Sequence, residues 1–194
     1  DDGGFLRFFK VVSRTLPPVR WQLFHWAHYP LLYWVEDDTS TMGYALQPHA
    51  REAAAAWNER TGFPLFAETA DSAGADLVVE LAPISFMGVT TVTDPKRSYL
   101  GWVEVRRAKI KVNYTLRALD YFRGIVLHEL GHAAGCYAHS DCNLGEAPHV
   151  MAPGAGDVPG WQRMSEAISD EEALTARLVV TLPQGFDTRV YLPE

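Results

Sequence analysis

The stretch His128-Glu129-Leu130-Gly131-His132-Ala133-Ala134-Gly135 determines how the rest of the chain is interpreted. Positions i and i+4 of a helix lie one turn apart on the same face, so a helix here points the imidazoles of His128 and His132 at one ion. Glu129 borders the same space and is not needed as a ligand. Two imidazoles, a neighbouring carboxylate and a third ligand are typical of a catalytic zinc site that keeps one position for water. The stretch therefore predicts a zinc-binding helix that ends at Gly135.

Length and composition are those of a single folded domain. The chain has 194 residues, and 47% of them are hydrophobic, which is enough for a substantial core. No apolar run is long enough to span a bilayer. The formal net charge of -7 and the absence of a basic cluster argue against nucleic acid as the main partner.

Both cysteines, Cys136 and Cys142, follow the histidine stretch directly. They could form a disulfide, remain free thiols or act as soft zinc ligands. We favour the disulfide, because the spacing can close a small loop and nothing else in the chain completes a cysteine-rich metal site. A disulfide implies a secreted or periplasmic protein.

Apolar periodicity and turn residues predict an α+β domain. Helices are expected at 47–60, at 116–134 and from a capping box at 169–172 to about 178. Strands are expected at 31–35, 63–68, 76–81 and 88–93, with one or two more at 102–112 near a sheet edge where charges face water. We predict one catalytic domain over 1–194. It comprises an N-terminal extension (1–30), an upper sheet and helix subdomain (31–135) and a mostly irregular lower subdomain (136–194) that holds the last helix.

The chain resembles the metzincin zinc endopeptidases, and most of all their matrixin (matrix-metalloproteinase-like) branch. The family pattern is His-Glu-x-x-His-x-x-Gly-x-x-His followed by a Met in a tight turn. His128, Glu129, His132 and Gly135 match this pattern, and Val150-Met151-Ala152-Pro153 resembles the Met-turn. A coarser likeness covers most of the chain from about residue 31 to residue 178.

One departure concerns the third histidine. The family spacing places it at position 138, which is an alanine here, and His139 comes one residue late. The loop must therefore bulge to present His139. A Cys136–Cys142 disulfide would bracket the bulge and contribute about 2–3 kcal/mol on the chain-entropy model. Asp141 and His149 remain rivals for the position of third ligand.

The resemblance implies a metzincin-like catalytic domain with a twisted mixed five-stranded sheet, an active-site helix and a backing helix. It implies one catalytic Zn²⁺ on His128, His132 and His139, with Glu129 as general base and then general acid. Met151 is expected to pack as a floor beneath the metal. The implied activity is endopeptidase cleavage of a peptide or protein substrate, by a protein that we expect to be a monomer.

Further inferences concern the substrate pocket. Gly124 lies one turn before His128 and either leaves space beside the zinc or allows close helix packing. Pro153 would begin the outer wall of the pocket. The resemblance implies that substrate backbone pairs with an edge strand near Gly101–Val105.

Two alternatives remain open at the level of the sequence. A calcium site made from Asp71, Asp76 or Asp94 has no supporting pattern, and solvated carboxylates explain these residues as well. The alternative function is a catalytically silent zinc-binding protein of peptidase fold that binds a partner. Glu129 argues against it, since a protein that only binds has no need of a base.

Overall fold

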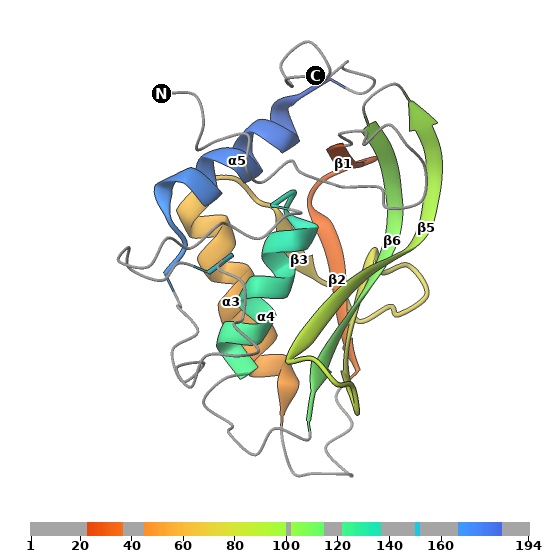
Figure 1. Ribbon diagram of the computed structural model, residues 1–194, viewed down its shortest axis with the longest axis vertical. Coiled ribbons are helices and arrows are strands. Elements are labelled where there is room, and N and C mark those ends of the chain that lie inside the picture. The colour runs from red at the N-terminus through yellow and green to blue at the C-terminus, as the bar shows by residue number, and fades with distance from the viewer. Residues whose placement is uncertain are drawn as a thin grey trace.

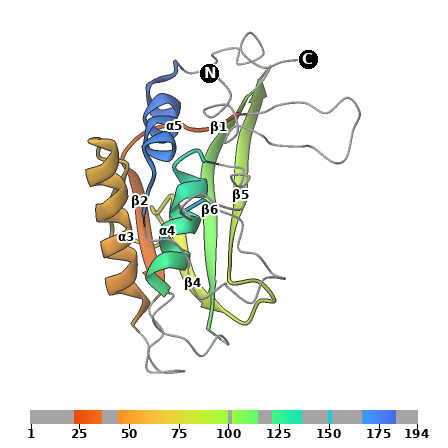
Figure 2. The ribbon, with the colours of Figure 1, turned by 60° about the vertical axis from the view of Figure 1, so that its left-hand side comes forward.

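The computed structural model describes residues 23–36, 45–99, 102–114, 122–136, 150–151 and 167–183. Within these ranges a six-stranded sheet is covered by helices on one face (Figures 1 and 2). The elements in chain order are β1 (Leu23–Trp26), β2 (Leu31–Glu36), α3 (Leu46–Thr61), β3 (Phe66–Glu68), β4 (Leu77–Ala82), β5 (Gly88–Tyr99), β6 (Trp102–Asn113), α4 (Phe122–Ala133) and α5 (Asp170–Thr181).

The sheet has six strands where five were expected, and it is mostly parallel rather than evenly mixed. β3 pairs with β2, β2 with β4, and β4 with β6, all in parallel. β5 runs antiparallel along β6. β1, which the sequence did not predict, pairs in parallel with Trp102–Val105 of β6, whereas β4 pairs with Ala108–Asn113 of the same strand. Because β5 occupies one edge of β6, β1 and β4 lie end to end along the other edge.

β6 is an interior strand, so the expectation that its charges mark a sheet edge is wrong. Ile110 and Val112 are buried in the hydrophobic core, while the alternating Lys109 and Lys111 are half-buried on the opposite face. Alternation along a strand separates the two faces of a sheet and not its edge from its centre. Among the described strands, β5 pairs only with β6, so its outer edge is unpaired, and it packs against α4.

α3 follows its predicted span to within one residue at either end. Its buried face consists of small residues around one large aromatic, namely Leu46, Ala50, Ala53, Ala54, Trp57 and Thr61. The small side chains allow α4 to approach closely. The indole Nε1 of Trp57 donates to the carbonyl oxygen of Leu127 at 2.8 Å. This bond joins the two helices one residue before His128.

α4 carries the histidine stretch and is buried along nearly all of its length. It ends as predicted at Gly135, which has a φ of 110°. The N–H of Gly135 donates to the His132 carbonyl, and the N–H of Cys136 donates to the Gly131 carbonyl, which is the Schellman arrangement. A Cβ on Gly135 would also lie 2.8 Å from a methyl carbon of Val179 on α5. Glycine is therefore required here both by the backbone and by the neighbouring helix.

α5 begins with the predicted capping box, in which Ser169 and Glu172 exchange side-chain to backbone hydrogen bonds. Arg60 at the end of α3 holds this start in place. Its Nε donates to the Ile168 carbonyl at 3.0 Å, and its Nη2 lies 2.5 Å from Asp170 Oδ1. None of the helices in the described ranges is long and apolar enough to cross a membrane.

Candidate metal centre

His128 and His132 lie on one face of α4 with their ring centroids 4.7 Å apart and their planes nearly perpendicular. One potential ligand atom from each of His128, Glu129 and His132 lies within 4.8 Å of the others. In the part of the chain that the structure describes, this is the one group of three or more such side chains. The structure therefore brings together the three residues that the sequence singled out first.

Backbone carbonyls fix the tautomer of both imidazoles. His128 Nδ1 is 2.6 Å from the Val150 carbonyl oxygen, and His132 Nδ1 is 3.0 Å from the Cys136 carbonyl oxygen. A carbonyl oxygen can only accept, so each Nδ1 carries the proton. In the neutral rings, Nε2 then bears the lone pair, which is the form in which imidazole binds a metal. The donor chemistry of the pair thus fits a zinc ion.

Glu129 is buried next to the two rings, and residues of β5 hold its side chain in place. The Thr90 hydroxyl donates to Glu129 Oε2 at 2.6 Å and also approaches the Glu129 carbonyl oxygen at 3.0 Å. Gly88, two residues earlier on β5, leaves space for the carboxylate, since a Cβ there would lie 2.6 Å from Oε1. Burial raises the pKa of Glu129 to about 7, although the Thr90 hydrogen bond opposes the rise. A carboxylate with such a pKa can exchange a proton at neutral pH.

Met151 packs under the turn of α4 that joins the two histidines. It is fully buried, and its Sδ lies against Gly131 so closely that a Cβ on Gly131 would overlap it. The same Cβ would lie 2.8 Å from Cζ2 of Trp57. The absence of a side chain at Gly131 therefore lets α4 rest directly on Met151 and Trp57.

Cys136 has a free, buried thiol, so the predicted Cys136–Cys142 disulfide is not formed in this structure. The Sγ donates to the backbone carbonyl of Glu172 at 3.5 Å. Burial raises the pKa of the Cys136 thiol well above its usual range, and the nearby Glu172 charge adds to the effect. The short spacing to a second cysteine suggested a bridge, but the side chain of Cys136 points into the interface with α5 instead.

Several predicted site residues lie outside the described ranges. These are His139, its rivals Asp141 and His149, the second cysteine Cys142, and Pro153. Gly124 is described and is buried within α4, one turn before His128. The third ligand therefore stays a prediction.

The calcium alternative gains no support from the described aspartates. Asp76 Oδ2 accepts from the Leu32 N–H at 2.7 Å and lies 3.1 Å from His28 Nε2. Asp71 Oδ1 accepts from the N–H of Ala73 in its own turn. Both carboxylates are thus engaged with the protein.

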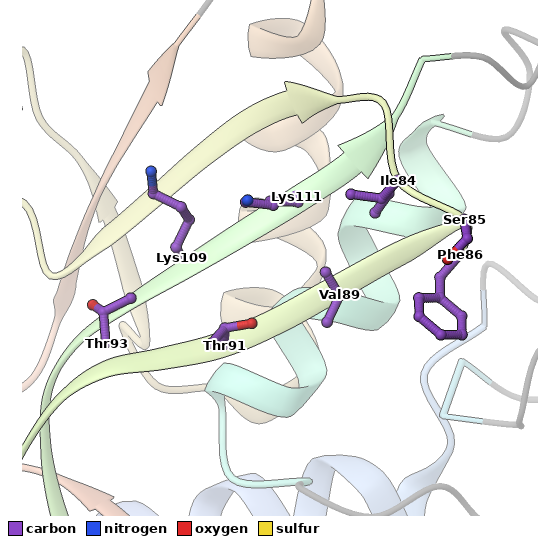
Figure 3. Close-up of a pocket in the computed structure, with 8 residues that line it drawn as sticks. All are labelled: Ile84, Ser85, Phe86, Val89, Thr91, Thr93, Lys109 and Lys111. Carbon is purple, nitrogen blue, oxygen red and sulfur yellow. The ribbon is translucent and has the colours of Figure 1, made fainter.

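A pocket of about 460 Å³ lies on the opposite face of the sheet from α4 (Figure 3). Val89 and Thr91 line it and flank Thr90, whose side chain reaches Glu129 on the helix side. Lys109 and Lys111 also line it, but both are drawn toward Glu80, with N–O distances of 2.9 and 3.8 Å. This pocket is separated from the histidines by the sheet, so it is not part of the candidate centre.

Thr90 and Glu172 are the contributors that the sequence did not reveal. Nothing in the local pattern links position 90 to position 129. Glu172 Oε1 accepts a hydrogen bond from the Met151 N–H at 2.7 Å, and the capping box in the sequence explained Glu172 only on its own helix. No protein-family model matches the chain, and no curated protein sequence is significantly similar to it.

Proposed function

We propose that this protein is a zinc-dependent endopeptidase of the metzincin type, with His128 and His132 as ligands and Glu129 as general base and acid. The proposal is supported by the two imidazoles and the carboxylate that one turn of α4 brings together. Two imidazoles with protonated Nδ1 atoms stand beside a buried carboxylate whose pKa is about 7. His139 is the proposed third ligand.

A zinc ion held by these residues would supply a Lewis acid and acidify a water molecule. Glu129 would take a proton from water on its carboxylate and return it to the leaving amine. The Thr90 hydroxyl keeps that carboxylate in one orientation during both transfers. The carbonyls of Val150 and Cys136 keep the two rings in their ligating tautomer.

The unpaired edge of β5 is the proposed place for substrate backbone, in place of residues 101–105. β5 carries Thr90 and Gly88, so a strand added along it would lie beside Glu129. The secreted or periplasmic location stays a prediction, and the absence of a bridge at Cys136 removes its main support.

The test is hydrolysis of a mixture of denatured proteins, with and without a zinc chelator, followed by mass mapping of the cut sites. We expect the wild type to cut in a chelator-sensitive manner and Glu129→Gln to bind zinc without cutting. His49→Ala, a histidine on α3 outside the group, serves as the matched control and should retain both properties. Appreciable turnover by Glu129→Gln would refute the role of Glu129.

Two further outcomes of this test are informative. Zinc binding by the wild type without any hydrolysis would favour the alternative, a silent zinc protein that binds a partner. Zinc content after replacement of His139, Asp141 or His149 by alanine would identify the third ligand. Full zinc content in His139→Ala would refute the proposed ligand set.

A further inference from the structure

The environment of Glu172 is unusual for a residue of a capping box. Its side chain is fully buried, although a cap needs only one of its carboxylate oxygens. Oε2 accepts from the Ser169 N–H at 2.6 Å and completes the box. Oε1 accepts from the N–H of Met151 at 2.7 Å, in the separate segment 150–151. Burying a carboxylate is costly unless it is well hydrogen-bonded, and a helix cap alone gives no reason for that cost.

The Met151 N–H belongs to the same peptide unit as the Val150 carbonyl. That carbonyl oxygen accepts a hydrogen bond from the Nδ1–H of His128, with a nitrogen–oxygen distance of 2.6 Å. A single amide plane therefore lies between the Glu172 carboxylate on one side and the His128 imidazole on the other. Hydrogen bonds in such a chain polarise one another, so the carboxylate makes the carbonyl a stronger acceptor. A stronger acceptor at Nδ1 makes Nε2 a better metal ligand.

The second imidazole is tied to the same residue by a different route. The backbone carbonyl of Glu172 accepts a hydrogen bond from the Cys136 thiol. The Cys136 carbonyl in turn accepts a hydrogen bond from the Nδ1–H of His132. Both acceptors that fix the histidine tautomers thus belong to segments that hydrogen-bond to Glu172. One residue on α5 connects two segments that are separated in the sequence.

We propose that Glu172 is a positioning residue of the metal centre, which holds and polarises the peptide that orients His128 and anchors the segment that orients His132. The inference rests on the proposed metal site but not on peptide hydrolysis. It predicts that zinc affinity depends on the Glu172 carboxylate more than on the capping box to which it belongs.

The variant Glu172→Gln isolates this role. Glutamine has the same shape but offers one acceptor oxygen and an NH₂ group, so it cannot accept from both Met151 and Ser169. Ser169→Ala is the matched control, because it removes the other half of the capping box and leaves the carboxylate at Met151. We expect Glu172→Gln to bind zinc about 10-fold to 100-fold more weakly, as replacement of outer partners of metal ligands typically does. Ser169→Ala should bind zinc as the wild type does.

Zinc affinity is measured by competition with a chromophoric chelator, after circular dichroism has shown that each variant is folded. A second readout uses the metal-free protein: nitrogen NMR of the imidazoles should show the Nδ1–H form of His128 in the wild type and in Ser169→Ala. In Glu172→Gln we expect a mixture of tautomers. If Glu172 only capped its helix, both variants would lose stability, and neither would differ from the other in the tautomer of His128.

Equal zinc affinity of Glu172→Gln and wild type, with an unchanged His128 tautomer, would overturn the proposal. If Glu172→Gln does not fold, hydrogen exchange of the Met151 amide in the metal-free wild type decides instead. Strong protection is expected, and rapid exchange would overturn the proposal. A wild type that binds no zinc would refute the proposed function, while the tautomer measurement would still judge the role of Glu172.

Discussion

Replacing Glu129 by glutamine should stabilise the metal-free protein, and the gain should grow with pH. Burial raises the pKa of Glu129 from 4.5 to about 7 in the folded protein. Between these values the folded state keeps a proton that the unfolded chain has released. The free energy of unfolding of the wild type therefore falls as pH rises through this interval. The neutral amide that Glu129→Gln introduces avoids this loss and still accepts the Thr90 hydrogen bond.

The interval between the two pKa values corresponds to about 3 kcal/mol. Because part of this loss has already occurred at pH 5, the advantage of Glu129→Gln should grow by about 2–3 kcal/mol between pH 5 and pH 8.5. Urea-induced unfolding in the presence of a chelator measures it at each pH. Glu59→Gln, the same change of charge at an exposed site on α3, supplies the baseline.

Bound zinc should reduce the difference, because a nearby cation favours the ionised carboxylate. An advantage of Glu129→Gln that stays constant from pH 5 to pH 8.5 would refute the reasoning. In that case the Glu129 carboxylate would have to be better solvated or better paired than its burial indicates.

Three shorter predictions concern the same region. Gly88→Ala should impair hydrolysis and leave zinc content unchanged, because its Cβ would displace the Glu129 carboxylate. As a control, Gly74→Ala should be neutral in both assays, because its Cβ meets only the exposed Asp71 side chain. Gly131→Ala should lower the free energy of unfolding by about 1–2 kcal/mol in urea titrations, since overpacking costs more than the gain in helix propensity, and a stabilised variant would contradict this. Zinc at 100 times its dissociation constant should stabilise the wild type by about 2.7 kcal/mol, a shift that His132→Ala should abolish.

Local pattern was sufficient to predict the helices and most of the strands. The alanine stripe of α3, the capping box of α5 and the glycine that ends α4 are all signals carried within a few residues. β1 was missed because it has only four residues, and its partner β6 lies far along the chain. The same limit explains Thr90, which meets Glu129 only because β5 lies beside α4 in the folded structure.

The site could be predicted in outline, since His128, Glu129 and His132 are placed by one helix. The groups that hold these side chains could not be predicted. The carbonyl oxygens of Val150 and Cys136 and the carboxylate of Glu172 come from separate segments of the chain. Spacing alone did not predict the environment of the Cys136 thiol. A nearby second cysteine suggested a bridge, whereas packing against α5 directs the thiol elsewhere.

The bond between the Trp26 indole and the Ala133 carbonyl, 2.8 Å long and closing 107 residues of chain, has a consequence for synthesis. At about 5–20 residues per second, Trp26 is made about 5–20 s before its acceptor. β1 must also wait for β6, and α5 with Glu172 leaves the ribosome later still. The histidine helix is therefore completed by the earliest and the latest described segments together, so a nascent chain truncated before α5 should not yet hold a metal in its final geometry.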